Sequence, residues 1–277
     1  MKSILVPVET HPGMRATLEI ACLWASEFGS YIEGFALRPA LPAFVGADAL
    51  GAGVPYVYPE QDAAAAVAAS TLFQGVMAER GVTPAGGEGI VPSFGWLSNV
   101  FPGDSYVGTY GRVFDITIVG QPGSGGSRMS TLEAALFDSG RPVLLVPPDA
   151  APTKVCDSIL IAWNGSSETA RAIAFAWPLL SRAGRVVVLT VQGGNVPDPA
   201  GEDVARHLRR SGARAEARTV VAGSRSVGEA ILDETLAVGA DVLIKGAYTQ
   251  SRLRQIIFGG STRHIIAEAK LPVFLAH

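Results

Sequence analysis

A glycine-rich stretch near the C-terminus gathers the residues of this chain that are best suited to bind an anion. The apolar run 242–244 leads into a polar loop, and a pair of glycines and two hydroxyl residues precede an amphipathic segment. The residues concerned are Gly246, Ser251, Gly259, Gly260, Ser261 and Thr262. The first N–H groups of a helix are unsatisfied and its dipole favours negative charge. The stretch therefore predicts a strand, a glycine turn and a helix start that could hold a phosphate.

The same glycines could instead serve only to build the turn, because glycine-rich turns are common and weak signals. If a phosphate binds, hydroxyls and backbone N–H groups would donate to it, and Arg252 or Arg254 would supply positive charge. Spacing alone leaves both interpretations open.

No set of side chains suited to catalysis can be assembled from the sequence. Ser166 and Ser167 follow Gly165, but a nucleophile elbow needs G-x-S-x-G together with a His/Asp partner set. His207 and His264 fall on predicted polar helix faces, where solvent exposure is the simpler interpretation. We therefore predict no catalytic residue.

The elements that position the glycine stretch belong to a pattern that occurs twice in the chain. The matched segments are 3–8 with 158–163, 114–120 with 240–246, and 141–146 with 271–275. In each copy the first segment is followed by a polar turn and an alanine-rich helical pattern. A proline-rich linker at 147–153 separates the copies, which predicts two domains, 1–148 and 153–277.

The hydrophobic periods predict an α/β fold in each copy. Short continuous apolar runs, such as 185–191, suit strands that are buried on both faces of a parallel sheet. They alternate with segments of helical period, as in βαβ units. The strands expected in the second copy are 158–163, 185–191, 216–221, 241–245 and 272–276. We therefore expect two tandem flavodoxin-like domains, each a five-stranded parallel sheet with flanking helices and a ligand site at the carboxyl ends of its strands.

Composition narrows the class of protein. The chain has 277 residues, 48% of them hydrophobic and 17% charged, and a net charge of −3 without a long Lys/Arg run. This argues for a sizeable core and against nucleic-acid binding. Cys22 and Cys156 are more simply buried free thiols than a disulfide, and neither a structural zinc site nor another metal site is predicted. The N-terminus lacks a signal-peptide pattern and no apolar run reaches about 18 residues, so we expect a cytoplasmic protein without a membrane span.

The glycine stretch, GAYTQSRLRQIIFGGSTRHIIAEAKLPV, resembles the signature of universal stress proteins, in which glycines spaced G-x-x-G-(nine residues)-G precede Ser or Thr. The run ILIAWNGS at 159–166 and the repeat itself strengthen the likeness, so the whole chain resembles a tandem universal stress protein. The resemblance implies domains of the adenine nucleotide α-hydrolase-like type. It also implies that ATP or AMP, which Mg²⁺ could accompany, binds in the second domain, and that the protein has a role in the stress response. We expect little or no hydrolysis, since the sequence offers no dedicated base or metal-ligand set.

In that family the loop after the first strand holds adenine and the glycine motif holds the phosphates. Carried over, the base would lie near Ala162, Trp163, Asn164 and Gly165, and the phosphates near Gly246, Ser251, Gly259, Gly260, Ser261 and Thr262. Three positions depart from the family pattern. Thr249 replaces the second glycine, Gly260 stands where Ser or Thr is usual, and Asn164 replaces an Asp, although its amide can still hydrogen-bond a base or ribose.

The first copy departs further. Gly120 and Gly123 keep a G-x-x-G, followed by the run SGGS at 124–127, but no glycine pair opens the last helix. We interpret SGGS as a flexible loop without nucleotide, and Glu9 stands where the family often has Asp. An insertion at about 39–62 predicts either a lid on its own domain or a contact with another molecule.

Two functions remain open. One is nucleotide binding in the second domain; the other is a non-nucleotide regulatory or interaction module that uses the fold for association. In single-copy members of the family two domains pair through their last strands. The resemblance therefore implies an intrachain pair through Val143–Val146 and Val273–Leu275, with further homodimerisation open.

Overall fold

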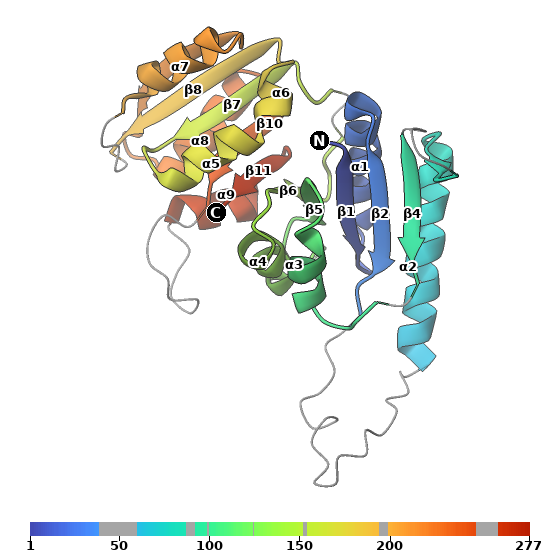
Figure 1. Cartoon of the computed structure of the whole chain (residues 1–277). Helices are drawn as coiled ribbons and strands as arrows, with labels where there is room; N and C mark the ends of the chain where they lie inside the picture. Colours follow the sequence, from blue (N-terminus) through green and yellow to red (C-terminus); the bar gives the residue numbers. More distant parts are fainter. Residues whose placement is uncertain are drawn as a thin grey trace, which may run out of the picture.

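The computed structural model describes residues 1–38, 60–86, 92–98, 100–123, 125–151, 154–193, 199–247 and 260–277. Within these residues the strands form one sheet in the order β3-β4-β2-β1-β5-β6-β11-β10-β7-β8-β9 (Figure 1). The strands are β1 (Ser3–Val8), β2 (Tyr31–Ala36), β3 (Thr83–Pro84), β4 (Ser93–Leu97), β5 (Ile116–Gly120), β6 (Val143–Val146), β7 (Ser158–Trp163), β8 (Arg185–Gln192), β9 (Ala215–Val221), β10 (Val242–Gly246) and β11 (Val273–Ala276). The helices are α1 (Met14–Phe28), α2 (Glu60–Glu79), α3 (Ser105–Gly111), α4 (Met129–Asp138), α5 (Ser167–Phe175), α6 (Trp177–Leu180), α7 (Gly201–Arg210), α8 (Val227–Ala237) and α9 (Gly260–Glu268).

The two halves of the sheet have the same internal topology. In the second half β7, β8, β9, β10 and β11 are the first to fifth strands, all pairs are parallel, and their spatial order is 3-2-1-4-5. The first half repeats this order with β1, β2, β4, β5 and β6, and the two-residue β3 extends its edge. The prediction of two tandem α/β domains with five-stranded parallel sheets is confirmed. The order reverses beside the first strand of each half, so a site is expected where β7 and β10 end.

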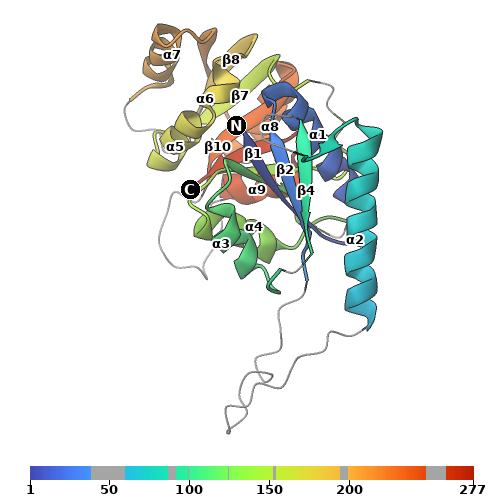
Figure 2. The same ribbon diagram turned by 45° about the vertical axis from the view of Figure 1, so that its right-hand side comes forward.

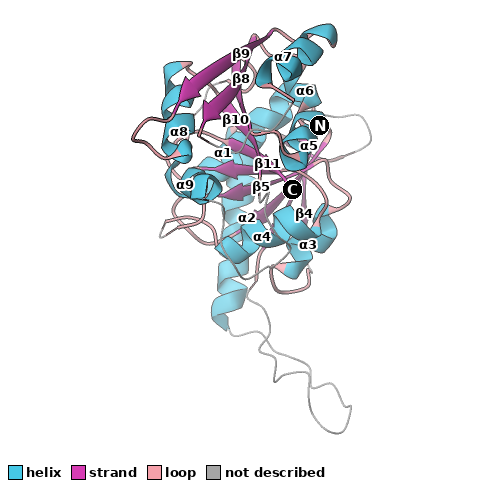
Figure 3. Cartoon of the chain, turned by 90° about the vertical axis from the view of Figure 1, so that its left-hand side faces the viewer, coloured by secondary structure: helices cyan, strands magenta, loops and turns pink. Residues whose placement is uncertain are grey.

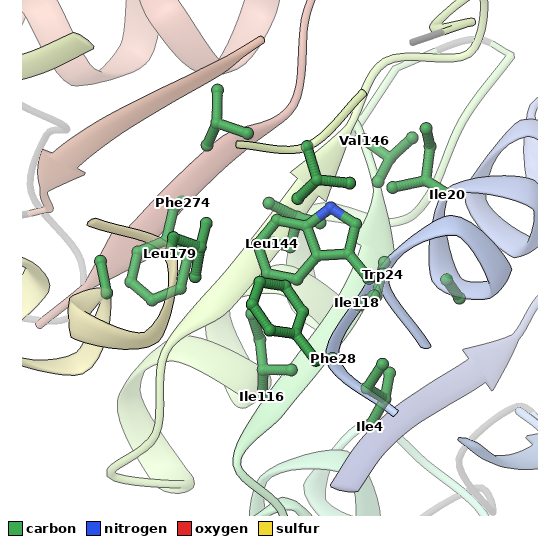
Figure 4. Packing of buried hydrophobic residues seen from close by; sticks show 14 of the residues in the cluster. Ile4, Ile20, Trp24, Phe28, Ile116, Ile118, Leu144, Val146, Leu179 and Phe274 are labelled. Carbon is green, nitrogen blue, oxygen red and sulfur yellow. The ribbon is translucent and has the colours of Figure 1, made fainter. Parts of the chain in front are cut away.

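The halves join through their last strands. β6 pairs with β11 in the antiparallel sense, with Leu144 opposite Phe274, as the resemblance implied. Trp24 of α1 stacks on Phe274 with ring centroids 6.5 Å apart, and Leu144, Leu179 and Ile116 complete the contact (Figure 4). This apolar cluster is continuous across the junction, so the chain closes its two exposed sheet edges on each other.

Helices cover both faces of the sheet, as the apolar strands require (Figure 3). One buried cluster lies under α1, α2, α5, α6 and α7, and a second lies under α3, α4, α8 and α9. In the first half the long α2 lies along α1 (Figure 2) and places Phe73 and Met77 in the first cluster. Alternate residues of β10 enter the two clusters, with Val242 and Ile244 in one and Leu243 in the other.

Local sequence sets the helix starts. Ser226 accepts a hydrogen bond from the backbone N–H of Glu229, whose side chain accepts from the backbone N–H of Ser226, a capping box at the start of α8. Ser166 caps α5 by accepting from the backbone N–H of Thr169 at 3.2 Å. The alanine-rich helical pattern after β7 forms two helices, α5 and α6, which are divided at Ala176 because Pro178 cannot donate to the preceding turn.

The interpretation of the SGGS run as a flexible loop is wrong for the residues that the structure describes. The carbonyl of Gly125 accepts a hydrogen bond from the N–H of Gly13 at 3.1 Å, and Ser127 is buried and donates to Glu9. Gly126 leaves space for the carbonyl of Gln121, which a Cβ would meet at 1.9 Å. The loop therefore packs into the first domain.

Other predictions have mixed outcomes. Cys22 is buried and Cys156 half-buried, both are free thiols, and burial raises the pKa of each to about 12.

Residues 39–59 of the predicted insertion lie outside the described residues. The domain limits 1–148 and 153–277 stay a prediction. No helix in the described parts of the chain is both long and apolar enough to span a membrane.

Candidate functional site

The structure brings residues predicted for the base and for the phosphate to one place. Ala162, Trp163 and Asn164 at the end of β7 line a cavity of about 40 Å³ together with Ser261 of α9. The remaining lining residues are Leu189, Val191, Val227, Ile231 and Lys245. Of the other predicted residues, Gly260 is exposed at the start of α9 and Thr262 is buried in the first turn of that helix. Ser251 and Gly259, with Thr249, Arg252 and Arg254, lie outside the described residues.

Asn164 has a structural task that the sequence did not indicate. Its Oδ1 accepts hydrogen bonds from the backbone N–H of Ser166 at 3.2 Å, from the Ser166 hydroxyl at 2.8 Å and from the Thr169 hydroxyl at 2.6 Å. The carbonyl oxygen therefore organises the turn into α5. Its amide nitrogen has no hydrogen-bond partner among the described residues, so the donating end of the side chain is available at the cavity.

Gly246 is required by helix packing. A Cβ at this position would stand 2.4 Å from the backbone nitrogen of Thr169 and 2.7 Å from the carbonyl carbon of Glu168. The glycine thus lets the first turn of α5 lie against the end of β10. The structure therefore supports a structural role for Gly246. Contact between Gly246 and a phosphate stays a prediction. Gly165 has φ of 76° in the turn after β7, a conformation that favours glycine.

Lys245 was missed by the sequence analysis and lies at the centre of the site. It is 5% exposed, and its Nζ donates to Thr262 Oγ1 at 2.8 Å and to the carbonyl of Gly246 at 2.9 Å. Burial lowers the pKa of this lysine to about 8. A signal was available in the sequence, because Lys245 interrupts the buried run 242–246, where a charged residue is unusual.

A second cavity of about 470 Å³ lies beside the first, at the ends of β8 and β9 and the start of α8. Val227 lines both cavities. The other lining residues are Gln192, Gly193, Val221, Ala222, Gly223, Arg225 and Ser226. Together the two cavities follow the carboxyl edge of the second half of the sheet, where doubly wound folds bind their ligands.

A third cavity, of about 710 Å³, lies on the other face of the sheet between α5, α6 and α7. Its walls are mostly apolar and include Ile173, Trp177 and Leu208. Trp163 lines this cavity as well as the small one, and its Nε1 donates to the carbonyl of Pro199 at 2.9 Å.

The first half contains a different arrangement at the equivalent place. Glu9 follows β1 as Asn164 follows β7, and its carboxylate accepts from Arg128 Nε at 3.1 Å, from Thr131 Oγ1 at 3.2 Å and from Ser127. Arg128 Nη2 also pairs with Asp104 Oδ1 at 3.0 Å. Burial raises the pKa of Glu9, against the opposing effect of Arg128. A side-chain carboxylate thus occupies the start of α4, where a bound anion would lie.

The histidines do not form a catalytic set. His207 is exposed as predicted, but His264 is half-buried against Gly228 of α8. The ring of His11 lies against Gly120, and burial lowers its pKa against the opposing effect of the Gly125 backbone. Across the described segments no three His, Cys, Asp or Glu side chains come together as a metal site.

The aromatic side chains of the first half lie in different surroundings. Phe94 and Trp96 pack on Phe73 with ring centroids 5.6 and 5.2 Å apart, whereas Phe101 is 79% exposed. Tyr56 and Tyr58 lie outside the described residues. The described members therefore belong to the core and the surface of the first half and line none of the three cavities above.

Comparison with known proteins connects this geometry to a family. The sequence profile of the Universal stress protein family matches residues 156–277. A universal stress protein from Archaeoglobus fulgidus DSM 4304 superposes with a TM-score of 0.72 at 16% identity, covering 99% of this chain and 95% of its own. A second protein assigned to this group, from Pseudomonas aeruginosa UCBPP-PA14, gives a TM-score of 0.56 at 13% identity and covers 100% of this chain and 93% of its own. At these identities the likeness establishes the tandem fold.

No curated protein matches the chain in sequence. A universal stress protein in complex with cAMP covers 45% of this chain and 99% of its own at 18% identity, but its TM-score of 0.35 is too low to indicate a ligand here.

Proposed function

Residues 156–277 form a universal stress protein domain and the whole chain has the fold of a tandem universal stress protein, and from this premise we propose that the second half binds an adenine nucleotide. The nucleotide would lie along the carboxyl ends of β7, β8 and β10. In this proposal the chain acts in a stress response as a nucleotide-binding protein with little or no hydrolysis. The cytoplasmic location expected from the sequence stays a prediction.

One observation carries the proposal. Asn164 and Ser261, far apart in the sequence, line a single cavity with Lys245, at the place where the strand order reverses. Residues predicted for the base and for the phosphates therefore converge on one site, whereas among the described residues of the first half Glu9 fills the equivalent place.

The size of the site limits how a nucleotide can fit. The inner cavity of about 40 Å³ is too small for a purine, whereas the adjoining cavity of about 470 Å³ falls in the usual range of roughly 300–1,000 Å³ for small-ligand sites. We place the nucleoside in the larger cavity and one end of the ligand across Val227, which differs from the base position near 162–165 that the resemblance implied. Mg²⁺, if bound, would be held by phosphate oxygens and water, since the described residues offer no carboxylate cluster.

Blocking the cavities tests this function. Val227→Trp would fill the space shared by both cavities, and Leu236→Trp, on an exposed position of the same helix, is the matched control. We expect calorimetry to show ATP or AMP binding to the wild type and to Leu236→Trp but not to Val227→Trp. Mass spectrometry of small molecules released on denaturation would identify a co-purifying nucleotide. A wild-type protein that releases none and gives no heat with ATP, ADP or AMP would overturn the proposal.

The arrangement in the first half favours the alternative function, a module that binds no nucleotide and uses the fold for association. There the carboxylate of Glu9 satisfies Ser127, Arg128 and Thr131, so the site is closed by the chain itself. For that half we propose a role in holding the intrachain pair together. The same calorimetry decides between the alternatives for the second half.

A further inference from the structure

Two apolar helix faces oppose each other across the cavity of about 710 Å³ in the second half. On one side, α5 and the start of α6 present residues at i, i+3, i+4 and i+7, which fall on one face of a helix. These residues are Ala170, Ile173, Ala174 and Trp177. On the other side, Val204 and Leu208 line the cavity from successive turns of α7. The two helices therefore leave apolar surface between them that neither covers.

The first half closes the equivalent space with its own side chains. There α1 follows the first strand and α2 the second, as α5 and α7 do in the second half. Arg80, next to the end of α2, pairs with Glu19 of α1 at 2.9 Å, and Cys22 Sγ of α1 lies 3.6 Å from Met77 Sδ of α2. The helix α2 has 20 residues and α7 has 10. The cavity therefore distinguishes the second half and does not follow from the fold alone.

The charged groups around the cavity already have partners. Asp203 and Arg206 are its acidic and basic lining residues of opposite charge, and they form an ion pair within α7. The indole Nε1 of Trp163 is also used, since it donates to a backbone carbonyl at 2.9 Å. His207 and Ser211, the other polar lining residues, are exposed. The inner walls thus offer carbon surface, and a charged ligand would find neither a carboxylate nor a guanidinium that lacks a partner.

The size and the walls of the cavity suit a small organic molecule. Sites for such ligands usually measure roughly 300–1,000 Å³ and have mainly apolar walls, and this cavity falls within that range. Water against apolar walls is displaced favourably by an apolar group. Trp163 and Trp177 add indole rings, with which aromatic ligands can pack. These features together specify a neutral ligand with an aromatic skeleton.

We propose that the cavity between α5, α6 and α7 binds a neutral, apolar small molecule that packs on Trp163 and Trp177. The ligand would occupy the space that side chains of α2 fill in the first half. The site lies on the opposite face of the sheet from the two cavities assigned to the nucleotide. The inference is therefore independent of nucleotide binding.

A neutral dye and its anionic analogue test the site. N-phenylnaphthylamine is uncharged and fluoresces strongly in apolar surroundings, and anilinonaphthalene sulfonate has the same skeleton with a sulfonate added. Fluorescence titration of the full-length wild type should show the neutral dye binding at a single site. We expect its affinity to be at least about threefold higher than that of the anionic dye, because the sulfonate finds no free cation in the cavity.

A pair of matched variants locates the dye. Ala174→Trp would fill the cavity from α5, and Ala68→Trp, at an exposed alanine of α2, is the control. The neutral dye should bind to Ala68→Trp as to the wild type and at least about tenfold more weakly to Ala174→Trp. Ala170→Trp, one turn earlier on the same face, repeats the test if circular dichroism shows that Ala174→Trp does not fold.

Three results would overturn the inference. The first is equal affinity of the neutral dye for the wild type and for a folded cavity-filling variant, which would place the dye elsewhere on the protein. The second is a wild type that binds no neutral dye. The third is tighter binding of the anionic dye than of the neutral one, which would contradict the class of ligand. No nucleotide is present in these titrations, so each result leaves the proposed function to its own test.

Discussion

The Oγ1 of Thr131 donates a hydrogen bond to the carboxylate of Glu9 at 3.2 Å, whereas its counterpart in the second half, Thr262, accepts one from Lys245 Nζ at 2.8 Å. Both threonines are buried, follow a serine and lie at the start of the last helix of their half. One copy of the fold therefore carries its own anion at this helix start, and the other carries a cation. This difference explains why we assign a ligand to the second half alone.

Removal of the Glu9 carboxylate should destabilise the first half. Glu9→Ala leaves the buried Ser127 hydroxyl without its acceptor, whereas Thr131 and Arg128 keep Asp104 as an acceptor. We expect a loss of about 2 kcal/mol in the free energy of unfolding, the usual cost of an unsatisfied buried donor. Urea unfolding would measure it, with Glu79→Ala, an exposed partner of Arg15, as control at under about 0.5 kcal/mol. Equal losses in the two variants would contradict the structural role of Glu9.

Lys245 should make stability depend on pH in a defined window. Its pKa is about 8 in the folded protein against 10.5 unfolded, so between these values the unfolded chain binds more protons and the free energy of unfolding rises with pH. Below pH 8 the charged group is present in both states and its burial costs on the order of 3 kcal/mol. Lys245→Met should therefore be more stable than the wild type at pH 7, with the difference shrinking from pH 8 to 10.5.

Thermal unfolding across this pH range would measure the effect. The titratable groups on the helices around the site are present in both proteins, so their contributions to the pH dependence of stability cancel in the difference. These groups are Glu168, Glu229 and His264. Lys270→Met, on an exposed lysine, should show no such window. A constant difference between the wild type and Lys245→Met from pH 7 to 10.5 would show that Lys245 is not buried in solution.

A methyl group at Gly246 should force β10 and α5 apart. Because the added Cβ would stand 2.4 Å from the Thr169 nitrogen, which belongs to the backbone and cannot rotate away, we expect Gly246→Ala to cost about 3 kcal/mol. The matched change Gly75→Ala in α2 meets no atom within 4 Å and should stabilise by about 0.5–1 kcal/mol through helix propensity. Chemical denaturation of both variants checks the contrast, which a neutral Gly246→Ala would contradict.

The junction of the two halves should depend on Phe274. This side chain is fully buried and stacks on Trp24 across the β6–β11 pair. Phe274→Ala would leave a cavity at the junction and should cost about 3–5 kcal/mol. Phe101→Ala, at an exposed phenylalanine, should change stability by less than about 0.5 kcal/mol. If both variants unfolded like the wild type in urea, the two halves would not be stabilised by this contact.

Much of the architecture followed from sequence patterns that have local causes. Buried strands such as 158–163 and 185–191 are continuous apolar runs, and the repeat of these runs predicted two similar domains. The runs and their repeat depend on spacing along the chain, which the sequence states directly, whereas the pairing of the last strands was implied by the family resemblance. The contact between Gly246 and the Thr169 backbone could not be predicted from spacing, because the two residues meet only after α5 has packed on the sheet.

By itself, then, the sequence determined the fold class, the repeat and the residue types at the end of β10, and the family resemblance implied the pairing of the halves. Only the tertiary structure decided which of those residues act together. It placed Lys245 on Thr262 beside Asn164, and it put Glu9 into the equivalent space of the first half. The reason is physical: whether a charge is buried, and what satisfies it, depends on side chains from several strands and helices that meet only in three dimensions.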